Sequence, residues 1–468
     1  MTFTTLGPVA QAAGDSRRTA ATKATRGPYI RAGAVGAAAA LAVGLAACSS
    51  GSSGGSTSGS GSGGSAKSAL TIADVAPFSG ADAALGPTYL ASCYGATAAI
   101  NNAGGVLGHT LTCKSVDTRG DPADAVPAVN QMFASTPSLV LVIGCTSDEA
   151  ASVVPVINAH KMTAFCMTGQ SEFDSVHYPY FYRLVPPDLE ESYAMVAIAQ
   201  ELHYKRLALA FGNDIGSQTF IQPAISAIKK AGMTLTTNQT LDLTATTFRT
   251  EAEAIVQSHP DAILTEALGS ADPTLFAEIK SLNNGKMIPV IGTSAAISPA
   301  FFKSAAAAVG ASAFVSSFHA DNLVVESSGP AYSAFSKALL AQQGKVPGAT
   351  GDFTTYLSAP GGVHLYDAIN LSALAMLMSK STSPSTYGPD IIKIGNGVAG
   401  ATVCYSFAQC APLVKAGKAV RYEGPGGPTN FDSFHDSTGI FQVDTYSANG
   451  NVNVVGNLTA AQLRALAG

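Results

Sequence analysis

Two kinds of apolar pattern alternate along the chain from Leu70 onward. Short apolar runs, typical of buried strands, are separated by longer stretches in which apolar residues recur every three or four positions, as in amphipathic helices. This alternation favours an α/β fold with parallel sheets covered by helices on both faces. The predicted strands are residues 70–75, 111–116, 139–143, 163–166, 206–211, 233–241, 262–267, 288–291 and 313–318, and the predicted helices are 87–102, 122–133, 150–160, 218–231, 248–258, 274–282 and 299–308.

The alternation stops once and restarts at Arg206, which indicates two successive α/β halves of similar size. Residues 183–187 are the predicted first crossover between them. Farther on, two helices (330–343 and 363–378) are expected to pack on the first half, and three strands (420–423, 441–446 and 452–455) on the second. A chain that crosses repeatedly between two lobes forms a hinge with a cleft. The predicted boundaries are residues 68–185 plus about 320–415 for lobe I, and 186–319 plus about 416–468 for lobe II.

The first 47 residues have the organisation of an export signal. Five basic residues precede an uncharged run of Ala, Val, Leu and Gly from 32 to 47. This run is short for a helix that must cross about 30 Å of hydrocarbon, so a cleaved signal peptide is favoured over a permanent membrane span. Arg17 and Arg18 are compatible with twin-arginine export. However, no large apolar residues follow them directly, so the Sec pathway is favoured.

The signal ends in Leu45-Ala46-Ala47-Cys48, which resembles the bacterial lipobox, where the Cys is lipidated on sulfur and becomes the mature N-terminus. Residues 49–65 are Ser and Gly with one Thr, a flexible tether that cannot form a core. An ordinary cleavage site that happens to precede a Cys is the alternative. Because a tether follows directly, we expect Cys48 to be lipidated, with residues 48–67 joining the fold to the outer face of the cell membrane.

Charge and composition narrow the functional class. The chain of 468 residues is 47% apolar, enough for a substantial core, and carries a net charge of −5. Removal of residues 1–47 leaves 21 basic and 30 acidic residues, a net charge of −9. A nucleic-acid-binding protein normally carries a basic excess, so that class is disfavoured.

Seven cysteines are present, and lipidation of Cys48 leaves six. They fall in three close pairs, which suggests three short-range disulfides in an oxidising compartment. Six cysteines allow 15 pairings, so the connectivity is a hypothesis. A zinc site is the alternative, but there is no CxxC and no ligand-like spacing to a His, so we expect no metal. The predicted pairs are Cys93 with Cys113, Cys145 with Cys166, and Cys404 with Cys410.

Several motifs occur in one consistent order between about residues 70 and 455. The first strand leads into Pro77-Phe78-Ser79-Gly80, and Asn101-Asn102-Ala-Gly104-Gly105-Val-Leu-Gly108 precedes the second. Together they resemble the type I periplasmic binding proteins, specifically the branched-chain amino-acid (leucine/isoleucine/valine-binding) family. No single motif is specific to this family, but the combination of motifs in this order is. The further matches are Asp117, 121–125, Ile143-Gly144 with Ser147, Phe181-Tyr-Arg183 with Asp188, Lys205-Arg206, Asp261, 364–368, 422–427 and Phe431-Asp432.

The resemblance implies two Rossmann-like lobes with parallel central sheets, joined by a multi-strand hinge. It also implies the solute-binding protein of an ABC importer, which captures a small polar organic solute (an amino acid, an amide or a carboxylic acid) by closure of the lobes and presents it to permease subunits. A ligand-sensing subunit that signals to a membrane partner is the alternative, because the same lobes serve both roles. No cofactor and no nucleic-acid partner is expected.

Candidate binding residues follow the predicted strands. In open α/β sheets, ligands bind beyond the carboxyl ends of the strands, and hydroxyls or free amides at a helix start suit a carboxylate or carbonyl group. Thr146 and Ser147 have a second interpretation as helix caps. Ile215 and Leu268 are included because they align with tyrosines that cover the ligand in relatives. The predicted ligand-binding residues are Phe78, Ser79, Cys145, Thr146, Ser147, Thr168, Gly169, Ile215, Leu268 and Ser294.

Enzymatic function is disfavoured. The chain contains no G-x-S-x-G elbow, no Walker loop and no G-x-G-x-x-G after a strand. Ser226-Ala-Ile-Lys229 matches S-x-x-K, but it lies inside a predicted amphipathic helix, where Ser and Lys are common at this spacing. We therefore expect a binding protein rather than an extracellular hydrolase.

The resemblance also bears on the solute. In amino-acid-binding relatives an acidic side chain after a second-lobe strand holds the ligand ammonium group, but the matching loop, 292–296, contains no acid and places Ser294 there. Loss of a charge-assisted hydrogen bond costs about 1.5–3 kcal/mol. We therefore expect neutral cavity walls and an amide, a carboxylic acid or another neutral polar solute instead of a branched-chain amino acid. If the true alignment of this loop with the relatives differs by a few residues, Glu266 or Asp214 supplies the missing negative charge.

Overall fold

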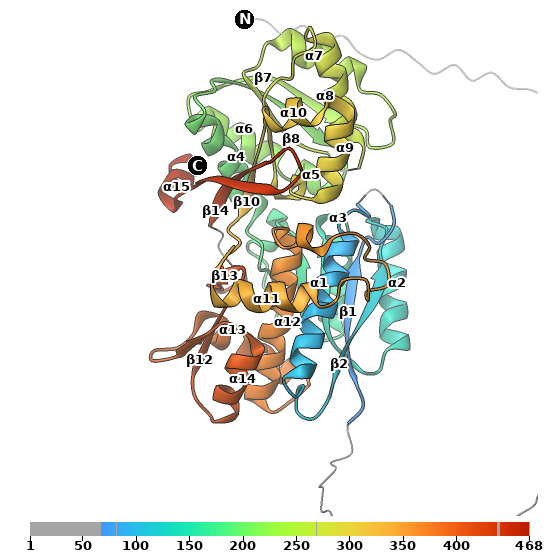
Figure 1. Ribbon diagram of the computed structural model, residues 1–468, viewed down its shortest axis with the longest axis vertical. Coiled ribbons are helices and arrows are strands. Elements are labelled where there is room, and N and C mark those ends of the chain that lie inside the picture. The colour runs from blue at the N-terminus through green and yellow to red at the C-terminus, as the bar shows by residue number, and fades with distance from the viewer. Residues whose placement is uncertain (1–66, 81, 268, 438–439, 468) are drawn as a thin grey trace, which may run out of the picture. The chain divides into compact units, whose positions relative to one another are not determined.

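A computed structural model describes residues 67–80, 82–267, 269–437 and 440–467. The predicted signal peptide, Cys48 and almost all of the tether lie outside the described residues. The secondary structure is an alternation of strands and helices built around two large sheets and one small one (Figure 1). Among the helices that the structure describes, none combines the length and the apolar character that a membrane crossing requires.

The first sheet has five parallel strands in the order β2-β1-β3-β4-β5. Every residue of its central strand β3 is buried, because helices cover both faces. On one face lie α2 and α3, and on the other lies α1. The strands are β1 (Leu70–Ala76), β2 (Leu111–Asp117), β3 (Leu139–Thr146), β4 (Ala164–Met167) and β5 (Phe181–Tyr182), and the helices are α1 (Gly86–Asn102), α2 (Pro122–Ser135) and α3 (Ser147–Ala159).

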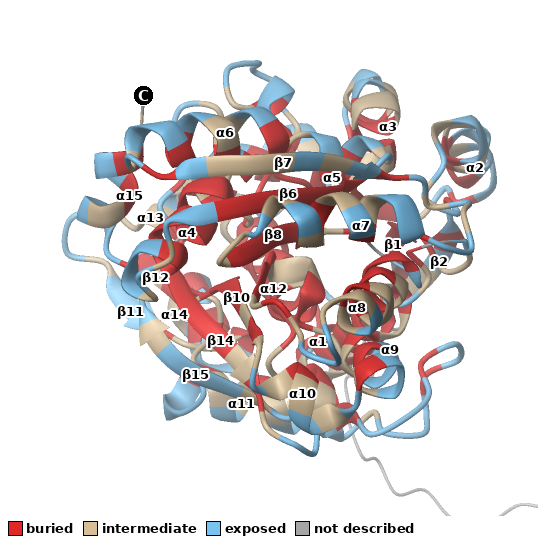
Figure 2. Ribbon diagram, turned by 90° about the horizontal axis from the view of Figure 1, so that it is seen from above, coloured by how far each residue is buried: buried red, intermediate tan, exposed pale blue. Residues whose placement is uncertain are grey.

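The second sheet has seven strands in the order β15-β14-β10-β9-β8-β6-β7. The strands from β6 to β10 are parallel to their neighbours, whereas β14 and β15 are antiparallel. The inner strands β6 and β8 are buried, the edge strand β7 is mostly of intermediate burial, and the edge strand β15 is largely exposed (Figure 2). The strands are β6 (Arg206–Gly212), β7 (Thr234–Leu241), β8 (Ala262–Glu266), β9 (Val290–Gly292), β10 (Phe318–Leu323), β14 (Phe441–Tyr446) and β15 (Val452–Asn457).

Helices cover both faces of this second sheet as well. Two of them, α4 and α15, pack together on the face that also carries α6. They are α4 (Asp188–Glu201), α5 (Ile215–Gln218), α6 (Ile221–Lys230), α7 (Arg249–Ser258), α8 (Ala271–Leu282), α9 (Pro299–Val309), α10 (Ala311–Val315) and α15 (Ala460–Leu466).

Residues after β10 return to the first sheet. The long helix α12 is rich in apolar residues and is buried over nearly its whole length, in contact with α1, α13 and α14. A small sheet, β11-β12-β13, joins the same core through Val420 and Tyr422. The elements are α11 (Gly329–Leu340), α12 (Pro360–Ser379), α13 (Pro384–Asn396), α14 (Phe407–Lys415), β11 (Thr402–Cys404), β12 (Val420–Gly424) and β13 (Gly427–Pro428).

Two sequence predictions about these regions are wrong. The strand predicted at 420–423 packs with the first half, not the second, because the Tyr422 hydroxyl donates to Asp367 of α12 at 2.8 Å and its ring joins that core. The strand predicted at 313–318 is instead helix α10 followed by β10. Gly310 ends α9 at a φ of 88° and α10 starts directly after it, so the strand begins only at Phe318 and ends at Leu323 in the second sheet.

The crossover after β5 contains a fully buried arginine. Arg183 donates from Nε and Nη2 to the two carboxylate oxygens of Asp436, at 2.6 and 2.5 Å. Nη2 also donates to Asp174 at 2.7 Å and Nη1 to the Gln170 carbonyl at 3.1 Å. The arginine therefore joins the segment that leaves the first sheet to the segment that precedes β14.

The three predicted disulfides are confirmed. Cys93–Cys113 joins α1 to β2, Cys145–Cys166 joins the neighbouring strands β3 and β4, and Cys404–Cys410 joins β11 to α14.

Candidate functional site

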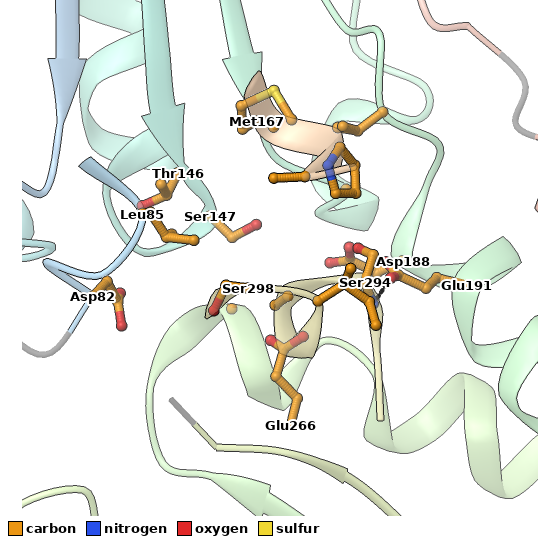
Figure 3. Close-up of a pocket in the computed structure, with 18 of the residues that line it drawn as sticks. Asp82, Leu85, Thr146, Ser147, Met167, Asp188, Glu191, Glu266, Ser294 and Ser298 are labelled. Atoms are coloured by element: carbon orange, nitrogen blue, oxygen red, sulfur yellow. Dashed lines mark hydrogen bonds between the residues drawn. The ribbon is translucent and has the colours of Figure 1, made fainter. Parts of the chain in front are cut away.

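A cavity lies where the carboxyl ends of strands from both large sheets approach each other (Figure 3). Its walls come from the loops after β1, β3, β4, β6, β8 and β9 and from the first residues of α4 and α12. Its volume is about 150 Å³. A cavity of about that size accommodates a benzene molecule. The position is the one at which open α/β sheets bind small molecules.

Four of the predicted binding residues line this cavity: Thr146, Ser147, Gly169 and Ser294. The hydroxyl of Ser147 points into it (Figure 3) and donates to Thr168 Oγ1 at 3.1 Å. Thr146 is also the helix cap that its second interpretation describes, since its amide and its hydroxyl donate to the two carboxylate oxygens of Glu149, at 3.0 and 2.6 Å.

The other predicted residues are placed elsewhere. The hydroxyl of Ser79 donates to Asp117 at 2.6 Å, Phe78 packs against the first core, and Cys145 is fully buried in its disulfide. Thr168 lies buried behind Ser147, where it bonds Gln170 at 3.2 Å. These four do not line the cavity.

Ile215 does not line the cavity either, and its side chain is 46% exposed. Asp214 caps α5 by accepting from the Ser217 amide at 2.7 Å. This turn places Asp214 and Gly216 on the cavity wall and directs Ile215 to solvent. Leu268 lies outside the described residues.

Carboxyl groups dominate the polar part of the wall. The expectation of neutral walls is wrong, because the acidic residues come from neighbouring loops and from α4, and not from the loop that matches the relatives. No Lys, Arg or His is among the described residues that line the cavity. The acids are Asp82, Asp148, Asp188, Glu191, Asp214 and Glu266.

Three of these carboxyl groups, Asp82, Asp148 and Asp214, form one cluster, which we call the outer acid group. Burial, and then the neighbouring charge of Asp148, raises the pKa of Asp82 to about 8. Burial and the charge of Asp214 also raise the pKa of Asp148. Asp148 Oδ1 accepts from the Gly216 amide at 2.8 Å, a hydrogen bond from the first residues of α3 to the first turn of α5.

A second cluster, the inner acid group, consists of Asp188, Glu191 and Glu266, with Asp321 beside them. Asp188 accepts from the Thr219 hydroxyl at 2.5 Å, and burial raises its pKa to about 8. Glu191 accepts from the Ser294 amide at 2.7 Å, and Glu266 accepts from the Thr293 hydroxyl. Burial, and then the charge of Glu191, raises the pKa of Glu266 well above its ordinary value.

Sequence reasoning missed most of these acids as binding residues. Asp188 and Glu191 lie on α4, a helix that the apolar pattern did not predict, because nearly all of its faces are buried. Glu266, the last residue of β8, and Asp214 were named from the sequence as alternative sources of the missing charge, and both line the cavity. Among the described residues, no group of three or more His, Cys, Asp or Glu is arranged to hold a metal ion.

A comparison of the sequence with models of protein families finds one match. A family model described as periplasmic binding protein matches residues 69–448. Among curated protein sequences none matches the chain.

The fold resembles that of several solved structures. One is the branched-chain amino acid transporter substrate binding protein LivJ from Streptococcus pneumoniae in complex with isoleucine, with 15% identity, 83% of this chain and 99% of that chain covered, and a TM-score of 0.66. Another is the leucine binding protein LivK from Thermotoga maritima, with 17% identity, 84% and 99% covered, and a TM-score of 0.66. A third is an ABC transporter solute binding protein from R. palustris in complex with 4-hydroxybenzoate, with 14% identity, 84% and 97% covered, and a TM-score of 0.65. At these identities the likeness shows the fold, which is the one predicted.

Proposed function

Since the chain belongs to the periplasmic binding protein family, we propose that it is the extracytoplasmic solute-binding protein of an ABC importer, anchored by a lipid on Cys48. It captures a small polar organic solute between two lobes and presents the closed form to permease subunits. Structural neighbours named as substrate-binding or solute-binding proteins of transporters support this role.

One observation carries the proposal: both halves of the fold contribute walls to the same cavity. Ser147 and Gly169 follow strands of the first sheet, and Gly216 and Ser294 follow strands of the second. A solute held there contacts both halves at once, so its binding favours the arrangement in which they approach. The hydrogen bond from the Gly216 amide to Asp148 Oδ1, at 2.8 Å, is a direct contact between the two halves at this cavity.

Solute capture is tested by isothermal titration against amino acids, amides and carboxylic acids, with small-angle scattering of each complex. We expect one class to bind and to reduce the radius of gyration. A solute that binds without any compaction would contradict capture by closure.

Anchoring is tested separately by metabolic labelling with a fatty-acid analogue. We expect label on the full-length chain and none on Cys48→Ser, which should be released into the medium. Equal labelling of both would contradict lipidation at Cys48.

A further inference from the structure

We propose that the solute of this cavity is an organic dication, a diamine or polyamine with two separated ammonium groups held by the outer and inner acid groups. This inference rests on the proposed function, since it names the class of solute that the binding protein takes. It departs from the amino acids and carboxylic acids that the family resemblance suggests.

The wall of the cavity is rich in buried acidic side chains. Asp82 and Asp188 are nearly fully buried, and Glu191 is too, with no basic side chain among the described residues that line the cavity. A buried carboxyl group without a cation or enough hydrogen bonds takes up a proton, as the pKa values of about 8 for Asp82 and Asp188 indicate, and it ionises when a cation is supplied. The protein supplies hydrogen bonds to some of these oxygens but no positive charge, so a cationic ligand is the missing partner.

The backbone amides at the cavity disfavour a carboxylate ligand. Backbone amides at the carboxyl ends of strands are the usual donors to a ligand carboxylate. Here such amides already donate to the protein's own acids: Thr146 to Glu149, Gly216 to Asp148, and Ser294 to Glu191. A carboxylate solute would have to displace these contacts, and its negative charge would be unfavourable beside any of these acids that is ionised.

A further buried acid, Asp321, lies behind the inner acid group. It is fully buried, and neither of its carboxyl oxygens has a hydrogen-bond partner. Side chains two apart on a strand share a face of the sheet, and Leu323, two residues along β10, lines the cavity. Asp321 therefore faces the same side, next to Glu191, and burial and the charge of Glu191 raise its pKa well above the ordinary value, so this acid too would ionise more readily beside a cationic ligand.

Asp82 of the outer acid group and Asp188 and Glu191 of the inner acid group lie at different ends of the cavity. Asp82 is on one side of the view in Figure 3, whereas Asp188 and Glu191 are on the opposite side, with Ser147, Ser298 and Glu266 between them. A single ammonium group contacts only one of these groups. Two ammonium groups joined by a short apolar chain contact both, and Leu85 and Phe220 give the chain an apolar surface.

The test is isothermal titration of the mature protein with 1,4-diaminobutane and spermidine, against 1-aminobutane and 1,4-butanediol. Each charge-assisted hydrogen bond changes affinity by about ten- to a hundredfold, so the diamine should bind at least tenfold more tightly than the monoamine, and the diol should not bind. Because a cation favours the ionised form of the raised-pKa acids, diamine binding at pH 7 should release protons, which titration in buffers of different ionisation enthalpy measures.

Two variants locate the charges. Asp82→Asn and Glu266→Gln should each reduce the preference for diamine over monoamine by about tenfold or more. The matched control is Glu253→Gln, an exposed acid on α7 paired with Arg249, which should leave the preference unchanged. Thermal unfolding of each variant separates loss of binding from loss of fold.

Leucine and 4-hydroxybenzoate are titrated in parallel, with small-angle scattering of every complex. Failure of both 1,4-diaminobutane and spermidine to bind overturns the dication. Tighter binding of leucine or 4-hydroxybenzoate, with compaction, overturns it too but leaves the proposed function intact. Binding of either class without compaction counts against the closure that the proposed function requires.

Discussion

The crossover at Arg183 and the cavity both contain buried carboxyl groups, but only the crossover pairs them with a positively charged side chain. At the crossover, Asp436 and Asp174 face a guanidinium whose three nitrogens all donate to described partners. In the cavity, six carboxyl groups face one another and no basic side chain among the described lining residues. The pKa of Asp82 and of Asp188 is raised to about 8 there, in each case chiefly by burial.

This difference separates a structural site from a binding site. Removing one member of a buried pair leaves an uncompensated charge, so a complete set such as that around Arg183 contributes to holding the fold. A cluster of buried acids without a cation lowers the stability of the free protein. A ligand that supplies the missing positive charge raises that stability again when it binds. The predictions below test whether the two sites differ in this way.

The largest expected effect is at the crossover. Arg183→Met leaves the buried Asp436 and the partly exposed Asp174 without their cation, which should lower the free energy of unfolding by about 3–5 kcal/mol. Urea unfolding followed by circular dichroism measures the change. Arg249→Met is the control, because Arg249 forms only an exposed pair with Glu253 and should change stability by about 0.5 kcal/mol or less. A loss below about 1 kcal/mol for Arg183→Met would show that the pair does not hold the crossover.

The second prediction concerns pH. Asp82 and Asp188 have raised pKa values in the folded protein, about 8 against 3.8 for the ordinary group. Between about pH 4 and pH 8 the folded state therefore binds more protons than the unfolded state, and stability should fall as pH rises through this window, then level off. One such group contributes at most about 1.4 kcal/mol per pH unit.

Urea unfolding of the free protein at a series of pH values measures this slope. Asp82→Asn should reduce the slope, whereas Asp124→Asn, which changes an exposed acid on α2, should not. Stability that rises from pH 5 to pH 8 by the same amount in wild type and Asp82→Asn would contradict burial of unpaired acids in the cavity.

These results also show what the sequence predicts and what it does not. The order of strands and helices and the disulfide pairs were predictable because each depends on residues close in the chain, such as Cys93 and Cys113 in consecutive elements. The place of Tyr422 was not, because it depends on a hydrogen bond to Asp367, 55 residues earlier. Likewise α4 shows little helical periodicity because it is buried on nearly all sides, so two acids of the cavity went unrecognised.

The third prediction is a gain of stability in the cavity. Asp321→Asn removes a fully buried acid whose oxygens have no hydrogen-bond partner while keeping its shape. We expect an increase in the free energy of unfolding of about 1 kcal/mol at pH 8 and little change at about pH 3, below the ordinary pKa of 3.8, where the acid is largely protonated in both states. If Asp321→Asn instead lowers the free energy of unfolding by the same amount at pH 8 and at pH 3, the carboxylate is compensated within the protein.

The smallest expected effect concerns the hydrogen bond between the two halves, from the Gly216 amide to Asp148 Oδ1. Asp148→Asn and Asp148→Ala both remove the charge and its repulsion with Asp82 and Asp214, but only Asn keeps an oxygen that can accept from Gly216. Asp148 also has side-chain hydrogen bonds with Asp82 and Asp214, so the difference between the two variants measures the hydrogen bonds of this side chain, of which the one from Gly216 is worth about 1 kcal/mol, or roughly a fivefold change in the ratio of closed to open molecules. Distances between spin labels on α3 and α5 measure that ratio, with Asp124→Ala, an acid in the first turn of α2, as the control. Equal closed populations for the Asn and Ala variants would mean that this hydrogen bond does not stabilise closure, which would leave the solute as what holds the two halves together.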